Sequence, residues 1–271
     1  MSEVVWFEEE ACADVRVAGG KGASLAAMTG AGLPVPPGFL IPAHALAGAV
    51  DGPKLREFAR ARDCERAQAL VRAAEPPREA IAEAYERLGG GPVAVRSSAR
   101  AEDSETASFA GQQETYLGVQ GAEKVCERVV DCWASFFTER ALFYRARKGS
   151  LDDLAMAVVV QRMVEPEKSG VLFTVDPVQR RRDRMVAEAV PGLGEQVVSG
   201  AVTPDHYVLD RAGAVMREQL QDGGVLTPGE LARLAALGRG LEERFGRPQD
   251  IEWAIADGEI YLLQSRPVTT L

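Results

Sequence analysis

The sequence predicts a mixed α/β fold of the α+β type, arranged as two lobes. Strand-like and helical segments follow one another without the strict alternation that produces a parallel βαβ sheet. The length of 271 residues is enough for one large domain or for two lobes. Near the middle, a β-branched strand runs into Pro166 and Gly170, which is typical of a hinge between lobes.

Helices are expected where apolar residues recur every three to four positions. The predicted helices cover Lys21–Met28, residues 53–88 as one or two helices broken at Pro76-Pro77, residues 122–148, and Pro228–Phe245. In the segment 122–148 the apolar residues fall on one side, and Cys126 and Cys132 are expected to pack there.

Strands are expected where β-branched residues cluster or where apolar and polar residues alternate. Six strand regions are predicted: Val4–Phe7, a strand that leaves the loop at Gly89 and ends on Arg96, a strand that follows a small-residue loop within Ala107–Val119, a central strand Leu154–Val164, the run GVLFTVDP, and the two strands of a hairpin within Gln249–Pro267. This order supplies the strands of both predicted lobes.

The hairpin sequence QDIEWAIADGEIYLLQSRP is unusual because polar residues interrupt two apolar strands. A three-residue loop, Ala256 to Gly258 with Gly258 left-handed in a bulge, suits ADG better than a two-residue turn. That loop would place Asp250, Glu252, Gln264 and Arg266 on one face, because side chains alternate along a strand.

The polar face of the hairpin has two interpretations from these residues alone. Two carboxylates at alternate strand positions can hold Mg²⁺, which takes oxygen ligands and shares them with phosphates. A surface ion pair between Asp250 and Arg266, with Glu252 in water, explains the same residues and is common.

Composition excludes some classes of function. Lys and Arg total 31 against 40 Asp and Glu, and the net charge of −9 disfavours general binding to nucleic acids or anionic membranes. The four cysteines form no CxxC pair, which indicates free thiols. No signal peptide and no apolar run near 18 residues is found, so a cytoplasmic protein is expected. The two histidines, His44 and His206, are expected to lie isolated in loops in structural or exposed positions.

Three glycine- or arginine-containing motifs suit phosphate binding, and each has a plainer alternative. GGKGAS combines close backbone approach with Lys21, although a tight turn with a solvated lysine is favoured when the motif is taken alone. In AVRSSARAEDS, Arg96 could fork onto phosphate oxygens or pair with Glu102 or Asp103. SFAGQ offers backbone donors at Ser108, Gly111 and Gln112, but is weak evidence alone.

Two further segments are less specific. The backbone of Met163 and Val164, at the end of the central strand, could hydrogen-bond a base edge or form an ordinary strand end. RRRDR, residues 180–184, is expected to be a solvated loop without a site.

Five motifs taken together resemble one family. GGKGASLAAM…GLPVPPGF, VRSSARAEDS…ASFAGQQETYLGV, VVQRMVEPEKSGVLFTVDP, GLGEQVVSGAVTPDHYVLD and QDIEWAIADGEIYLLQSRPV occur in that order. They are similar to the ATP-binding domain of the phosphoenolpyruvate synthase and pyruvate phosphate dikinase family, which rifampicin phosphotransferase shares. The resemblance runs from about Val4 to Val268.

The resemblance implies an ATP-grasp fold, with ATP and Mg²⁺ in a cleft between the two lobes. Residues 1–164 would form the lobe with the phosphate-binding loops, and 165–271 the lobe with the metal-binding hairpin. Lys21, Arg96 and Arg266 would clamp phosphates, and Asp250, Glu252 and Gln264 would hold Mg²⁺. The remaining implied nucleotide contacts are Gln161, Arg162, Met163, Val164, Glu188, Ser108, Gly111 and Gln112.

The resemblance also implies cleavage of ATP to AMP and transfer of the β- and γ-phosphates to a histidine. In the family that histidine lies on a swivelling domain beyond the ATP-binding domain, and neither His44 nor His206 lies in such a motif. A separate phosphohistidine partner and a small-molecule final acceptor are therefore expected. The stretch between Ala45 and Gly89 is shorter than is usual in the family, which bears on the adenine side of the cleft.

Two other hypotheses remain open at the level of sequence. The chain could be a stand-alone ATP-grasp kinase that phosphorylates a small molecule directly. It could also be a regulatory module that binds ATP without turnover, although such a module does not need the complete set of phosphate-binding residues.

Overall fold

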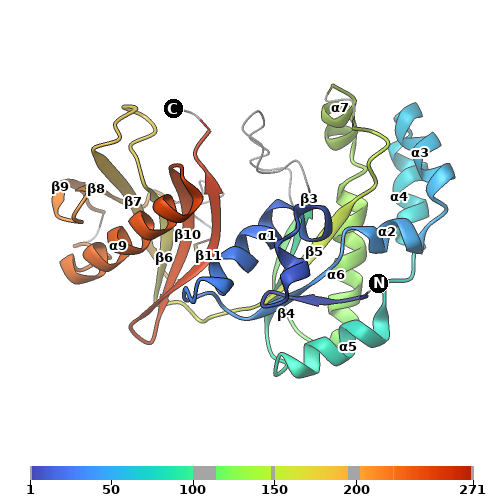
Figure 1. Ribbon diagram of the computed structural model, residues 1–271, viewed down its shortest axis with the longest axis horizontal. Helices are drawn as coiled ribbons and strands as arrows, with labels where there is room; N and C mark the ends of the chain where they lie inside the picture. The colour runs from blue at the N-terminus through green and yellow to red at the C-terminus, as the bar shows by residue number, and fades with distance from the viewer. Residues whose placement is uncertain (1, 100–113, 148–149, 195–201, 222, 270–271) are drawn as a thin grey trace. The chain divides into compact units, whose positions relative to one another are not determined.

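The computed structural model describes residues 2–99, 114–147, 150–194, 202–221 and 223–269 (Figure 1). Contacts divide the chain into two compact units, of which unit 1 is residues 1–32 and 37–163, and unit 2 is residues 33–36 and 164–271. The short segment 33–36 belongs to unit 2 because the Leu262 amide donates to the Pro34 carbonyl at 2.8 Å. None of the helices in the described ranges is long and apolar enough to cross a membrane.

Unit 1 contains an antiparallel five-stranded sheet with the order β1-β2-β5-β3-β4. Its strands are β1 (Val5–Trp6), β2 (Gly38–Ile41), β3 (Val93–Ala99), β4 (Thr115–Val119) and β5 (Met156–Arg162). The predicted central strand is confirmed, because β5 lies between β2 and β3. The strand predicted to end at Arg96 continues to Ala99, because Ser97, Ser98 and Ala99 keep pairing with β5.

Helices cover the sheet of unit 1. They are η1 (Glu10–Ala13), α1 (Val15–Gly30), α2 (His44–Ala49), α3 (Gly52–Ala61), α4 (Cys64–Arg72), α5 (Arg78–Arg87), α6 (Ala122–Ser135) and α7 (Glu139–Arg147). Two predicted helices were drawn too long. Arg62 turns left-handed at φ 55° and Asp63 caps the Arg66 amide, so the chain has three helices over 52–87. After α6 ends at Ser135, Thr138 caps the Ala141 amide at 3.3 Å and α7 begins.

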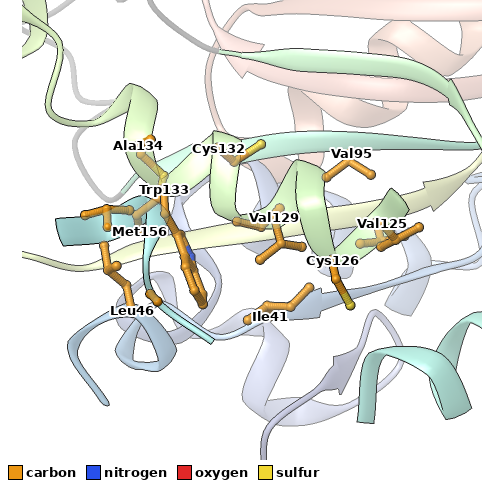
Figure 2. Packing of buried hydrophobic residues seen from close by; sticks show 14 of the residues in the cluster. Ile41, Leu46, Val95, Val125, Cys126, Val129, Cys132, Trp133, Ala134 and Met156 are labelled. Atoms are coloured by element: carbon orange, nitrogen blue, oxygen red, sulfur yellow. The ribbon is translucent and has the colours of Figure 1, made fainter. Parts of the chain in front are cut away.

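The apolar core of unit 1 lies between one face of the sheet and helices α2 to α6. Trp133 and Val129 of α6 are fully buried in it, together with Val158 and Val160 of β5. Figure 2 shows the Trp133 ring beside Leu46 and Met156. Cys126 and Cys132 are buried free thiols in this core, as the helix-packing interpretation predicted.

Unit 2 contains an antiparallel six-stranded sheet with the order β11-β10-β6-β7-β8-β9. Its elements are β6 (Lys168–Phe173), β7 (Arg184–Pro191), β8 (Asp205–Asp210), β9 (Val215–Gln219), α9 (Pro228–Phe245), β10 (Gln249–Ala256) and β11 (Glu259–Pro267). The mixed α/β class predicted from the sequence is thereby confirmed. Strands β7, β8 and β9 were not assigned from the sequence, and Arg184, expected in a loop, begins β7.

Helix α9 covers one face of the sheet in unit 2, alongside β10 and β6 (Figure 1). Its bounds match the prediction because both ends carry strong signals, a capping box of Thr227 and Glu230 and a left-handed Gly246 at φ 68°. Gly238 lets the helix approach closely, since a Cβ there would lie 2.8 Å from the Leu172 side chain. Leu172 and its strand partners therefore face α9, and the alternate residues face the opposite side.

Candidate functional site

In unit 1 a glycine kink brings Lys21 against the end of β3. Gly19 interrupts α1 with φ 68° and ψ 177°, and a Cβ at this position would lie 2.1 Å from the Ser98 carbonyl oxygen. Only glycine satisfies both the backbone angle and this approach. The helix resumes beyond the kink, and the buried Lys21 ammonium donates to the Ser97 carbonyl at 2.8 Å.

Ser98 holds this kink in place. Its hydroxyl donates to the Ala18 carbonyl at 2.8 Å and accepts from the Gly22 amide at 3.1 Å. The two bonds join Ser98 to residues on either side of Gly19. The turn of α1 that carries Lys21 is therefore attached directly to strand β3. The lysine is thus a buried and positioned cation, in contrast to the solvated lysine of the plainer alternative.

Arg96 and Gln161 face the same side of the sheet as Ser98 and α1. Arg96 lies two residues before Ser98 on β3, and Gln161 lies opposite Ala94 on β5. Both side chains are buried, at 8 % and 3 % exposure. Unit 1 therefore gathers Lys21, Arg96 and Gln161 on the face covered by α1, which is the face without the large apolar core.

Arg162 and Met163, at the end of the central strand, have partners within unit 1. The Met163 amide donates to the Pro92 carbonyl at 3.1 Å, so this donor is already used within unit 1. The expected contact of the Met163 and Val164 backbone with a base edge stays a prediction. Arg162 projects to the other face, where its guanidinium donates to the Leu88 carbonyl at the end of α5. Arg162 therefore has a structural partner on the side away from Gln161. Val164 begins the second stretch of unit 2.

The candidate phosphate loop cannot be placed in this geometry. Ser108, Gly111 and Gln112 lie outside the described residues. Their predicted contact with phosphates remains a prediction from the sequence.

In unit 2 the terminal hairpin has a different turn from the predicted one. Ala256 pairs with Glu259, so the loop has only two residues, Asp257 at φ 51° and Gly258 at φ 74°. Positive φ at both positions is the type I′ geometry that matches strand twist. The three-residue loop predicted from ADG is therefore wrong.

A bulge within the hairpin places the four polar residues on one face, an effect that was expected from the three-residue loop. Trp253 pairs with Leu262 but Glu252 pairs with Gln264, so Leu263 is an extra residue in β11. Beyond the bulge Asp250 pairs with Arg266. The four polar residues share one face, as predicted, and it is the face opposite α9.

The Asp250–Arg266 pair is the best defined polar contact of this face. Arg266 Nε and Nη2 each lie 2.8 Å from Asp250 Oδ2, and the aspartate side chain is 11 % exposed. Burial raises the pKa of the Asp250 carboxyl; Arg266 opposes this shift, and the carboxylates of Glu252 and Glu188 add to it. The ion pair considered from the sequence thus exists, within a larger cluster of like charges.

A row of side chains crosses the sheet beside this pair. Gln264 lies opposite Glu252, Glu252 opposite Val171, and Val171 opposite Glu188. The strand pairing therefore brings Glu188, 64 positions before Glu252 in the chain, onto the polar face. Sequence reasoning grouped these residues only through the family resemblance, because pairing between distant strands is not visible in a single sequence.

The same row continues to a residue that sequence analysis did not assign. His206 of β8 pairs with Glu188, and its Nδ1 lies 3.5 Å from Glu188 Oε1. The expectation of an isolated loop histidine is wrong for His206, which lies within a strand, and for His44, which begins α2. The alternation in DHYVLD, with Tyr207 and Leu209 buried, was the available sequence signal.

The oxygen ligands of this face fit a magnesium ion that also binds phosphate. Within the ranges that the structure describes, no three His, Cys, Asp or Glu side chains are grouped so as to hold a metal ion by themselves. Glu252 and Gln264, directly opposite each other, offer one carboxylate and one amide oxygen. Mg²⁺ is commonly held by one or two carboxylates together with water and phosphate oxygens, so this donor set suits it.

Comparison with known proteins shows the family to which the chain belongs. The model of the family described as "Pyruvate phosphate dikinase, AMP/ATP-binding domain" matches residues 15–224 and 212–271. The chain therefore belongs to this family of ATP-binding domains, and its members are ATP-dependent phosphotransferases.

The related proteins are longer than this chain. A probable phosphoenolpyruvate synthase of Methanocaldococcus jannaschii is 41 % identical, with 100 % of this chain and 27 % of the relative covered. A probable phosphoenolpyruvate synthase of Methanothermobacter thermautotrophicus is 40 % identical, with 99 % and 46 % covered. Rifampicin phosphotransferase of Streptomyces sviceus is 41 % identical, with 95 % and 35 % covered. The chain thus spans about a quarter to a half of these relatives.

Among solved structures, the D-alanyl-alanine synthetase A of Vibrio cholerae matches with a TM-score of 0.38 and 13 % identity, covering 92 % of this chain and 58 % of that one. The family assignment rests on the sequence relatives.

Proposed function

We propose that this chain binds ATP and Mg²⁺, cleaves ATP to AMP, and passes the β,γ-pyrophosphoryl group to a histidine on a separate swivelling domain or partner protein. A small molecule would be the final acceptor. The observation that carries the proposal is the polar face of unit 2, where Glu252 and Gln264 lie opposite each other beside the Asp250–Arg266 pair.

The residues of unit 1 would supply cations and a nucleotide contact. Lys21 and Arg96 would neutralise phosphate oxygens, and Gln161 would contact the base end of the nucleotide. Their burial supports this role, because preorganised charges in a site of low polarity stabilise developing charge at little reorganisation cost. Phosphoryl transfer depends mainly on such positioning and charge neutralisation.

The residues of unit 2 would hold the metal and the transferred phosphates. Glu252 and Gln264 would bind Mg²⁺, which would neutralise charge on the phosphates when bound. Arg266 would bind a phosphate oxygen while Asp250 keeps the guanidinium oriented, and Asp250 would be an additional metal ligand. Glu188 would contact the nucleotide from the same face.

The transfer step balances without any further reagent. A nitrogen of the acceptor imidazole bonds to the β-phosphorus, and the bond from that phosphorus to the oxygen bridging the α-phosphate breaks. AMP leaves with the bridging oxygen and its electron pair, and the second imidazole nitrogen gives up its proton. The product would be a pyrophosphorylated histidine.

The test is the identity of the nucleotide product. The chain would be incubated with ATP and Mg²⁺, alone and with the full-length Methanocaldococcus jannaschii relative in which the residue that aligns with Glu252 is changed to Ala. That relative would offer an acceptor histidine without its own ATP cleavage. AMP formed only in the mixture supports the proposal. ADP formed by the chain alone would indicate a direct kinase, and binding without any product would indicate a regulatory module; either result contradicts the proposal.

The metal assignment has its own test. Glu252→Gln should weaken binding of ATP in the presence of Mg²⁺ by at least about 100-fold, because it removes an anionic ligand from the metal. Calorimetric titration with and without Mg²⁺ measures the effect. Glu259→Gln is the matched control, since Glu259 lies on β11 of the same hairpin and pairs with Arg233 at 3.1 Å. An equal loss of ATP affinity in both variants would contradict the assignment of Glu252 as a metal ligand.

A further inference from the structure

Glu188 and His206 form a contact on the polar face of unit 2 that the proposed reaction does not use. The two residues lie directly opposite each other on β7 and β8. Nδ1 of the imidazole is 3.5 Å from Glu188 Oε1, and the side chains are 39 % and 32 % exposed. The histidine is therefore close enough to act on the carboxylate, and both side chains remain accessible to a ligand.

Several charged groups surround His206, so a positive charge on its imidazole would change their interactions. Among the described residues, strand pairing places charged groups of both signs on the same face. They include Glu188 and Arg184 of β7, Arg217 of β9, Asp210 of β8 itself, Glu252 and Asp250 of β10, and Arg266 of β11, which pairs with Asp250. Gln219 of β9, directly opposite His206, is uncharged. Glu188 is the acidic group nearest the imidazole, so the charge of His206 acts first on that carboxylate.

We propose that His206 is a positioning residue for Glu188 that makes the affinity for ATP depend on pH. The inference rests on the proposed function, in which Glu188 contacts the nucleotide. Histidine is the residue type whose charge changes between about pH 5 and 8. Protonation converts the contact with Glu188 into a charge-assisted hydrogen bond, which fixes the carboxylate on the nucleotide-facing side.

The sign of the effect follows from charge. The phosphates of ATP are anionic, and Glu188, Glu252 and Asp250 present three carboxylates to that face. A positive imidazolium beside Glu188 offsets one of these negative charges and reduces repulsion of the phosphates. ATP with Mg²⁺ therefore binds more tightly at pH 6 than at pH 8, and the effect of a half-exposed pair is about threefold to fivefold.

Substitutions at the two histidines separate positioning from charge. His206→Asn places a neutral amide donor near Glu188, so it keeps a polar neighbour for the carboxylate without an ionisable group. His206→Ala removes both. His44→Asn is the matched control, because His44 begins α2 in unit 1 and is the second of only two histidines in the chain.

The experiment is a set of calorimetric titrations with ATP and Mg²⁺ at pH 6 and pH 8, expressed as the ratio of the dissociation constants at the two pH values. Protonation of the nucleotide itself is common to every variant and cancels when the ratios are compared. We expect the ratio in the unmodified chain and in His44→Asn to exceed that in His206→Asn by about threefold to fivefold. His206→Ala should bind more weakly than His206→Asn at pH 8, because Glu188 has lost its donor.

Thermal unfolding of each variant at both pH values shows that the protein tested is folded. Equal ratios in the unmodified chain and in His206→Asn, with binding intact, would overturn this inference and leave the proposed function standing. Absence of ATP binding at either pH in the unmodified chain would instead contradict the proposed function.

A double variant provides the final check. In a Glu188→Gln background the carboxylate is gone, so adding His206→Asn should leave the pH ratio unchanged. A further change in that ratio would show that His206 acts on the nucleotide by another route, and would overturn its role as a positioning residue for Glu188.

Discussion

The sheets of the two units are both antiparallel, yet their polar faces differ: the face in unit 1 gathers two cations, and the face in unit 2 mixes carboxylates with arginines. In unit 1 helices cover both faces of the sheet, and the cations Lys21 and Arg96 are buried on the side of α1. In unit 2 one face is covered by α9, and the other carries Glu188, Asp250 and Glu252. The buried cations of unit 1 and the more exposed carboxylates of unit 2 are held in position by different structural features.

The support in unit 1 is backbone geometry, whereas in unit 2 it is strand register. Gly19 lets α1 touch the Ser98 carbonyl, and the Ser97 carbonyl accepts from Lys21. In unit 2 the bulge at Leu263 brings Gln264 opposite Glu252 and Arg266 opposite Asp250. A single side chain at Gly19 should therefore disrupt one site, whereas the other should tolerate changes that leave the pairing of its strands intact.

The largest effect is expected from Gly19→Ala. The added Cβ would meet the Ser98 carbonyl oxygen at 2.1 Å, and the residue has φ 68°, so both the close approach and the backbone oppose it. The free energy of unfolding should fall by about 2–4 kcal/mol, and ATP affinity should fall with it because Lys21 moves. Urea unfolding followed by circular dichroism, and calorimetric titration of ATP, measure the two effects.

Gly30→Ala is the matched control for this variant, since Gly30 lies in the same helix and a Cβ there meets nothing within 4 Å. Alanine favours a helix over glycine, so this control should be neutral or slightly stabilising. Normal stability of Gly19→Ala would show that the kink does not depend on a glycine. It would contradict the statement that backbone geometry at Gly19 positions the cations of unit 1.

A smaller effect is expected at the hairpin turn of unit 2. Asp257→Ala should lower the free energy of unfolding by about 1 kcal/mol, because alanine tolerates the observed φ of 51° less well than aspartate. Asp257→Asn should be nearly neutral, since asparagine suits a type I′ turn. Affinity for ATP should be unchanged in both, because β10 is also held in register by β6. A large loss of affinity in Asp257→Ala would show that the turn, and not the sheet, sets the site.

The smallest effect is a difference in the pH dependence of stability. Burial raises the pKa of Asp250 in the folded protein, so the folded state holds this proton more tightly than the unfolded state does. The contribution of Asp250 to stability is then present at acid pH and is lost as pH rises from the ordinary to the raised pKa. The free energy of unfolding of the unmodified chain, minus that of Asp250→Asn, should therefore decrease as pH rises above the ordinary pKa of an aspartate.

For Asp152 in unit 1, the contribution to the free energy of unfolding is expected to change with pH in the opposite direction. Asp152 is an exposed acid whose hydrogen bond from Arg60 lowers its pKa, so its contribution is present at neutral pH and lost on acidification. The corresponding difference for Asp152→Asn should increase with pH and weaken with added salt. Urea unfolding across the pH range checks both, and slopes of the same sign would contradict the assigned environments.

The elements predicted well are those whose signals are local. Helix α9 was bounded correctly by its capping residues and its terminal glycine, and the central strand β5 by its run of β-branched residues. The errors arose where a tertiary partner decides the outcome. Strand β3 extends past Arg96 because β5 continues beside it, and the edge strand β9 is exposed throughout and lacks the apolar run of a buried strand.

The candidate site shows the same division. The identities of Lys21, Arg96, Glu252 and Gln264 came from motifs and family resemblance, and the shared face of the hairpin was predicted correctly for the wrong reason. Three features could not be predicted from the sequence. The Met163 amide donates to a carbonyl of unit 1, Arg162 points to the face of the sheet away from Gln161, and Glu188 lies opposite His206. Each depends on which strand lies beside which, and at what register.

The sequence by itself determined the family, the mixed α/β class and the residue types that suit phosphate and magnesium, because these depend on local pattern and on the order of motifs. The tertiary structure decided which of those side chains share a surface. A shift of one residue in strand pairing moves every side chain to the other face, and in this chain the extra residue Leu263 makes that shift between Trp253 and Glu252. No local propensity sets that position, since it is fixed only when β10 pairs with β6 on one side and with β11 on the other.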